Sequence, residues 1–149
     1  MATQYNTNDV AQLIDRYMKA YETRNIDVLA QTVSKDVNFV AYGTDQGEVW
    51  HGWEVYLGAT EKLFGALDEI HWQRGKPAIR FSQDGNVAWF AEELSGKFLT
   101  GGEEHGCDLR ITGIAEKRGG QWTIVQFHRS VPFTPHAVPY LETHGVRFD

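Results

Sequence analysis

The chain has 149 residues, of which 42% are hydrophobic, 23% charged and 13% aromatic, and this predicts one globular domain with a substantial core. A formal net charge of −6, without any lysine–arginine cluster, argues against nucleic acid as a partner. The single cysteine, Cys107, excludes an internal disulfide, and the first residues resemble no secretory signal, so we expect a cytoplasmic protein without a membrane segment.

Three helices are predicted in the first part of the chain. Apolar residues recur at three- and four-residue spacing over 10–21, which indicates an amphipathic helix. Asn6, Thr7 and Asn8 offer an N-cap for this helix, and Arg24-Asn25 is expected to close it. A short second helix is expected over 26–32, and the apolar spacing over 53–67 predicts the third.

The remaining elements are predicted to be strands. Segments 36–42 and 48–51 flank a glycine-containing turn and indicate a short hairpin. After the third helix, four long antiparallel strands are expected over 70–81, 87–100, 108–117 and 122–131. Helices and strands that are segregated in this way predict an α+β fold, in which the helices cover one face of a curved sheet.

Prolines mark the end of the predicted sheet. Three of the four prolines follow the last predicted strand, and proline cannot donate a hydrogen bond to a strand ladder. We therefore expect a single domain over 1–149, with a core at about 8–133 and an extended tail over 134–149 that contributes no core strand.

The last predicted strand ends in the run Phe127-His128-Arg129-Ser130. Side chains alternate across a strand, so His128 and Arg129 are expected on opposite faces, one of them toward the interior. A buried arginine is costly unless an anionic group meets it. We expect Arg129 to face inward, within reach of Glu92 or of a bound anion, and this indicates a polar pocket inside the sheet.

The register between the last two strands has two solutions. A two-residue turn at Gly119-Gly120 would place Arg110 opposite Arg129. A three-residue loop with a glycine bulge would instead bring Gly113 to the face that carries Arg129. The sequence leaves both registers open.

The order of elements, together with a glycine turn followed by Trp122, Ile124 and the Phe127-His128-Arg129-Ser130 ending, resembles the nuclear transport factor 2-like superfamily and, within it, the SnoaL-like domains. The ending is similar to the closing strand of the association (hub) domain of calcium/calmodulin-dependent protein kinase II. The likeness covers roughly residues 8 to 133. The superfamily includes isomerases, cyclases, dehydratases, hydrolases and associative domains, so the resemblance predicts a cone-shaped fold more specifically than a function.

The resemblance implies a tapered pocket between the concave face of the sheet and the first and third helices. By its place in the motif, Arg129 corresponds to a pocket arginine of the kinase hub. Two other hub arginines align with Glu92 and Gly113, so this pocket is expected to be less basic. The resemblance also implies a two-fold homodimer through the other sheet face, which is expected to carry apolar residues such as Trp89, Trp122 or Ile124.

Glu92 and His128 are the candidate catalytic residues. Glu92 lies in mid-strand and is either a pocket carboxylate tuned by Arg129 or one half of a structural ion pair. His128 is either a proton-transfer group or a hydrogen-bonding residue at a dimer interface, and its opposition to Arg129 favours the interface. No complete catalytic set of the steroid isomerases or cyclases is found at matching positions.

The candidate ligand-binding residues are Arg129, Tyr17, Tyr21, Phe90 and Trp53. The two tyrosines lie four apart on the core face of the first helix, and buried hydroxyls need hydrogen-bond partners. Segment 103–108 contains residue types that bind metals, but without the spacing of a metal motif. We therefore expect neither a metal site nor a cofactor.

These patterns favour a domain that binds a carboxylate-bearing or other anionic small molecule in a polar and aromatic pocket. The alternative is a SnoaL-like lyase, isomerase or hydrolase that uses Glu92 or His128 for proton transfer. The expected partners are a small-molecule ligand and a second copy of the chain, without nucleic acid or a membrane.

Overall fold

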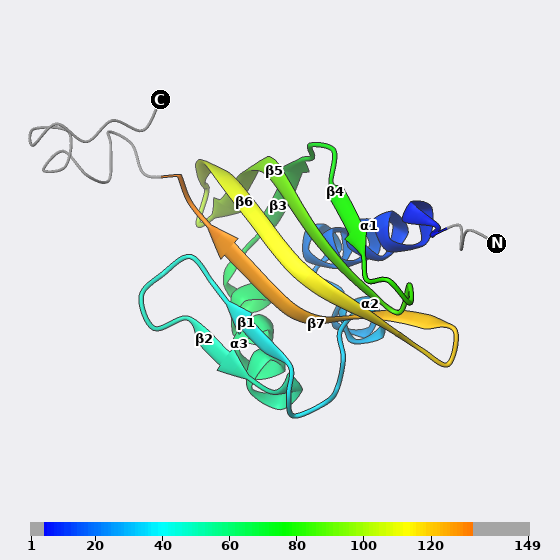
Figure 1. The fold of residues 1–149 in the computed structure, drawn as a ribbon. Helices are drawn as coiled ribbons and strands as arrows, with labels where there is room; N and C mark the ends of the chain where they lie inside the picture. Colours follow the sequence, from blue (N-terminus) through cyan, green and yellow to red (C-terminus); the bar gives the residue numbers. More distant parts are fainter. Residues whose placement is uncertain (1–4, 133–149) are drawn as a thin grey trace, which may run out of the picture.

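A computed structural model describes residues 5–132, in which helices pack on one side of a single curved sheet (Figure 1). The helices are α1 (Thr7–Thr23), α2 (Ile26–Thr32) and α3 (Trp53–Ala66). The strands are β1 (Val40–Tyr42), β2 (Val49–His51), β3 (Glu69–Gln73), β4 (Ala78–Phe81), β5 (Val87–Thr100), β6 (Glu103–Arg118) and β7 (Gln121–Ser130). This arrangement confirms the predicted α+β fold, with three helices on a strongly curved, mostly antiparallel sheet.

The sheet has seven strands, in the order β2-β1-β7-β6-β5-β3, and β4 also pairs with β5. The β1–β7 pair is parallel, while β5, β6 and β7 form a long antiparallel meander that curves across the molecule (Figure 1). Residues along this meander alternate between buried and exposed positions. One face of the sheet therefore packs on the core and the other faces solvent, as is common for antiparallel sheets.

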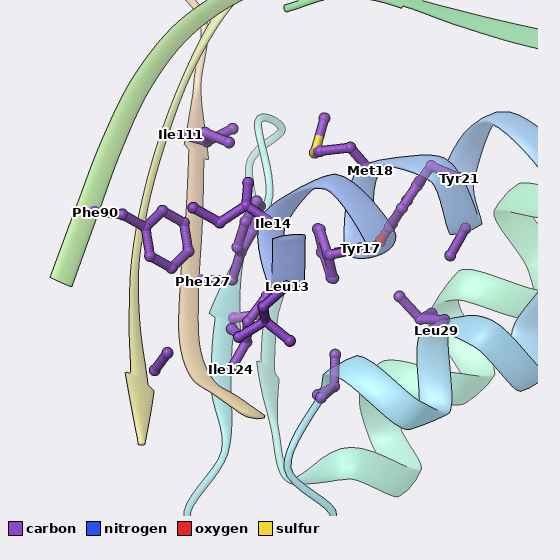
Figure 2. Close-up of a cluster of buried hydrophobic side chains, with 14 of the residues drawn as sticks. Leu13, Ile14, Tyr17, Met18, Tyr21, Leu29, Phe90, Ile111, Ile124 and Phe127 are labelled. Atoms are coloured by element: carbon purple, nitrogen blue, oxygen red, sulfur yellow. Dashed lines mark hydrogen bonds between the residues drawn. The ribbon is translucent and has the colours of Figure 1, made fainter. Parts of the chain in front are cut away.

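The helix predictions agree closely with the structure. The side chain of Asn6 accepts a hydrogen bond from the backbone N–H of Asn8 and caps α1. Arg24 ends the helix in the left-handed region, with φ of 50°. Figure 2 shows Phe90 and Phe127 projecting from the strands toward the buried face of α1, so the main core lies between this helix and the sheet.

Three strand predictions needed correction. The first predicted strand, 36–42, is reduced to β1. The long strand expected over 70–81 is divided into β3 and β4, because the connecting residues include Gly75 and Pro77. Proline cannot donate to the ladder, and the backbone at Gly75 lies too close to the carbonyl of Glu93 for any Cβ atom. The strand predicted over 108–117 is longer at both ends and forms β6.

A bulge sets the register between β6 and β7. The turn at Gly119-Gly120 has two residues, both with positive φ, and Arg118 pairs with Gln121 as the tight-turn solution requires. Farther along, a register shift between Ile114 and Ala115 moves the pairing by one residue. Arg129 therefore lies opposite Ile111 and not opposite Arg110. The structure combines parts of the two predicted registers. The turn has two residues, as in the first, but a bulge shifts the pairing, as in the second, and this bulge lies in mid-strand and not in the loop.

The two sheet faces differ from the prediction in their apolar residues. Trp89 is 49% exposed on the outer face, as expected. Ile124, in contrast, is fully buried on the inner face. Trp122 also lies on the inner side, where its ring packs 5.9 Å from that of Phe81. Two of the three residues proposed for the outer face therefore belong to the core side.

Other expectations concern the ends of the chain and membranes. The extended tail over 134–149 lies outside the described residues, and β7 ends at Ser130. Among the helices of the described part, none is long and apolar enough to cross a membrane.

Candidate functional site

The end of β7 carries Arg129 on the inner face and His128 on the outer face. His128 is exposed, and its ring lies 5.6 Å from that of Tyr42 on β1. Arg129 is half-buried and extends toward the helices. His128 therefore has no access to the interior, and the catalytic role considered for it in a pocket is not compatible with this position.

Three tyrosines and one arginine meet beneath the sheet and form what we call the tyrosine–arginine cluster: Tyr17, Tyr21, Tyr56 and Arg129. Tyr17 and Tyr21 lie one turn apart on the buried face of α1 (Figure 2), and the hydroxyl of Tyr56, on α3, hydrogen-bonds to both of theirs. Arg129 Nη2 donates to the hydroxyl of Tyr17 at 2.9 Å. The cluster joins two helices to the last strand.

The guanidinium of Arg129 is held by aromatic rings and a phenol. Its Cζ atom lies 4.2 Å from the ring centroid of Tyr21 and 5.2 Å from that of Phe127, within the range of cation–π attraction. Within residues 5–132, no carboxylate forms an ion pair with it. Its Nε is buried and has no hydrogen-bond partner there. A buried N–H without an acceptor is costly, so the site has an unused donor.

The cluster perturbs its own ionisation. Burial raises the pKa of Tyr17 and Tyr56 well above the usual range of tyrosine. Burial acts in the same direction on Tyr21, but the Arg129 guanidinium and the neighbouring hydroxyls outweigh it and lower its pKa. The lowered pKa of Tyr21 therefore has an electrostatic cause, which is the neighbouring Arg129 cation together with hydrogen bonds within the cluster.

A cavity of about 250 Å³ opens beside the cluster. Arg129, Tyr21 and Tyr56 line its inner part. Its walls are apolar and largely aromatic, and include Trp50, Leu63, Ile70, Trp72, Phe98 and Leu109. The loop between β1 and β2 contributes Thr44, Asp45 and Glu48. The arrangement matches the general form of small-molecule sites, in which a few polar groups are set in an apolar pocket.

The predicted contact between Glu92 and Arg129 does not form. The buried carboxylate of Glu92 instead binds Arg74 in a bidentate pair, at 2.6 Å from Nε and 2.7 Å from Nη2. Arg74 also reaches Asp15 on α1 at 3.1 Å. This geometry agrees with the second interpretation of Glu92, as one half of a structural ion pair. Both of its carboxylate oxygens accept hydrogen bonds from the guanidinium of Arg74, which lies in the connection between β3 and β4.

The remaining candidates divide between the site and the core. Tyr21 lines the cavity. Tyr17 does not line it, but its hydroxyl accepts a hydrogen bond from Arg129. Phe90 packs 6.3 Å from Phe127 in the core, and Trp53 is the buried first residue of α3. Neither residue lines the cavity. Tyr56, on the buried face of α3, is a member of the site that was not among the predicted ligand-binding residues, although a phenol on the buried stripe of a helix signals a need for polar partners.

Segment 103–108 contains residue types that bind metals, at the start of β6. His105 there reaches only Glu103, at 3.6 Å, on the exposed surface. Within residues 5–132, no group of three or more His, Cys, Asp or Glu side chains is placed to hold a metal ion.

Comparisons with known proteins place the chain in a family. A model described as the SnoaL-like domain matches residues 10–134. A nuclear transport factor 2-like protein of unknown function from Pseudomonas putida has a TM-score of 0.73 at 23% identity, over 95% of this chain and 93% of that one. No match was found among curated proteins.

Two further solved structures are similar in fold. A Xanthomonas campestris protein named after the calcium/calmodulin-dependent protein kinase II association domain has a TM-score of 0.74 at 21% identity, over 90% of this chain and 93% of that one. A Novosphingobium aromaticivorans protein named after scytalone dehydratase has a TM-score of 0.75 at 11% identity, over 85% and 83%. At sequence identities between 11% and 23%, these similarities show a shared fold and not a shared function. The chain belongs to the SnoaL-like domain family and has the nuclear transport factor 2-like fold.

Proposed function

We propose that this domain binds a small organic anion, in particular a carboxylate, with Arg129 as the anion-binding residue. The observation that carries the proposal is the buried Nε of Arg129, which has no acceptor within residues 5–132 and belongs to a side chain that lines the cavity. A ligand carboxylate could accept from Nε and a neighbouring terminal nitrogen together, which is the strongest arrangement available to a guanidinium.

The surroundings of Arg129 suit a carboxylate better than water. Tyr21 and Tyr56 present hydroxyls beside the cation and could donate to the second oxygen of the ligand. The apolar walls would exclude solvent and strengthen the charge interaction. The cavity of about 250 Å³ corresponds to the liquid volume of roughly eight water molecules. This size suits a ligand with a single ring or a short chain.

The proposal is tested by benzoate titration of the wild type and two variants in a calorimeter. Arg129→Met keeps the apolar length of the side chain but removes the donors, and should weaken binding by about a hundredfold, as expected for a partly buried charged hydrogen bond. Arg110→Gln removes a cation from the exposed outer face and should bind like the wild type. Equal affinity of all three proteins would exclude Arg129 as the anion site.

A second candidate is an enzyme of the lyase, isomerase or hydrolase class in which Tyr21 transfers the proton. It is favoured by the lowered pKa of Tyr21 at the cavity wall, and the similar fold named after scytalone dehydratase is consistent with it. Glu92 and His128 are not proposed for this role, since one is ion-paired and the other lies outside. In this case Tyr21→Phe would abolish any conversion of a copurifying ligand followed by mass spectrometry, whereas Tyr42→Phe, which changes an exposed tyrosine, would retain it.

A further inference from the structure

The cavity also contains negative charge. Asp45 and Glu48 line it from the loop between β1 and β2, and Asp45 is exposed to solvent. Arg129 instead contacts the fully or nearly fully buried residues Tyr17 and Tyr21. Asp45, with Glu48 in the same loop, therefore lies toward the entrance, and the guanidinium lies against the buried tyrosines, so opposite charges line different parts of the cavity.

Within the described residues, no ion pair balances the two carboxylates at the entrance. No lysine, arginine or histidine in residues 5–132 forms an ion pair with Asp45 or Glu48. Glu48 Oε2 accepts from the backbone N–H of Asp45 at 3.0 Å, which brings the two acidic residues into one turn. Two negative side chains on one turn favour a cation nearby.

These charges bear on which anions could reach Arg129. A simple carboxylate would pass two negative side chains on its way in, and this repulsion opposes its binding. A ligand with a positive group at its other end would gain from the same side chains. Trp50, Trp72 and Phe98 line the same cavity, and their flat rings suit an apolar or aromatic body that joins the two charged groups of such a ligand.

We infer that the cavity selects a zwitterionic ligand, with a carboxylate at Arg129 and a protonated amine at Asp45 and Glu48, joined by a short apolar or aromatic spacer. This inference rests on the proposed anion site and adds the second recognition element. Arg129 would fix one end and the acidic pair the other, so the ligand would bind in a single orientation.

Matched ligands separate the two elements. The 3- and 4-isomers of aminomethylbenzoate carry both charges, while the corresponding hydroxymethylbenzoates have nearly the same shape without the cation. Calorimetric titration of the wild type should show that one aminomethyl isomer binds about fivefold to tenfold more tightly than its hydroxymethyl counterpart, as expected for one or two partly exposed charge pairs.

Variants test whether the preference for the amine over the alcohol comes from the acidic residues at the entrance. The double variant Asp45→Asn/Glu48→Gln should bind the aminomethyl and hydroxymethyl compounds equally well. The control Glu103→Gln/Glu104→Gln removes the same charge from exposed positions on β6 and should retain the preference. Arg129→Met should weaken binding of every ligand in the set. Circular dichroism and the melting temperature would show that each variant is folded.

Each remaining outcome has one meaning. If the wild type does not distinguish amine from alcohol in either isomer, or if the preference survives in Asp45→Asn/Glu48→Gln, the inference about the entrance is wrong. The anion site still stands in that case, provided that Arg129→Met weakens binding. If no benzoate derivative binds the wild type, or if binding ignores Arg129→Met, the proposed function itself is wrong and the zwitterion inference falls with it.

Discussion

The guanidinium of Arg129 lies over the ring of Tyr21, with its Cζ atom 4.2 Å from the ring centroid. The same group donates a hydrogen bond to Tyr17, one helical turn away. A cation on the inner face of the sheet is thus held by two phenols of α1 and not by a carboxylate of the described residues. This contact makes the ionisation of Tyr21 and the anion affinity of Arg129 interdependent.

The first prediction concerns the titration of the cluster. The folded pKa of Tyr21 is lowered, so its ionised form stabilises the protein at high pH, and that contribution is lost as the pH falls through the folded pKa. Tyr17 and Tyr56 have raised values, so their contribution is complete below the unfolded pKa of about 10 and is lost as the pH rises further.

The measurement is the ultraviolet absorbance of tyrosinate as a function of pH. The wild type should show an early component that is missing in Tyr21→Phe and retained in Tyr42→Phe, which removes an exposed tyrosine. Benzoate affinity should fall over the range of that early component, because a phenolate beside Arg129 neutralises it. Identical titration curves for wild type and Tyr21→Phe would contradict the assignment.

The second prediction concerns the pair of Arg74 and Glu92. Arg74→Met would leave a buried carboxylate without its cation, and should lower the free energy of unfolding by about 3 kcal/mol. Replacing both residues, as Arg74→Met/Glu92→Met, should recover much of this loss. Urea denaturation measures both effects.

A matched control for this pair is an exposed one. Lys19→Met removes a cation that lies 3.1 Å from Glu22 on the surface of α1, and should change the free energy of unfolding by less than about 1 kcal/mol. If Arg74→Met had an effect as small as this, Glu92 would not depend on Arg74, and a role for its carboxylate elsewhere would have to be reconsidered.

The third prediction concerns Gly113, the position that aligns with a hub arginine. A Cβ atom there would lie 2.8 Å from the carbonyl oxygen of Gln126 and would overlap the ring of Phe90. Gly113→Ala should therefore destabilise the fold by about 1–3 kcal/mol. Gly106→Ala on the same strand, where the nearest atom is 3.7 Å away, should be tolerated. Equal denaturation midpoints for the two variants would show that the strands adjust more easily than this packing indicates.

The fourth prediction concerns assembly. The outer face exposes Trp89 and Tyr42, at 49% and 43%, without any helix of the described chain over them. We expect a two-fold dimer through this face, since exposed apolar patches mark partner surfaces. Light scattering at micromolar concentration should give twice the chain mass for the wild type and for Val55→Glu, a control on α3. Trp89→Glu should give a monomer, and a monomeric wild type would refute the expectation.

Much of the local structure was predictable from sequence. Apolar spacing gave α1 and its buried stripe, so Tyr17 and Tyr21 were already expected on one face of one helix. Strand alternation showed that His128 and Arg129 must lie on opposite faces. These inferences succeed because helix and strand periods are local properties, set by neighbouring residues in the chain.

The contacts that form the site depended on the tertiary structure. Arg129 meets Tyr17 across 112 positions of sequence, and Tyr56 meets Tyr17 across 39. A mid-strand bulge sets the register at the end of β7, and the β3–β4 connection places Arg74 against Glu92. Local periodicity determines which face a side chain occupies, but its partner depends on register and packing between distant segments, and no single segment encodes these.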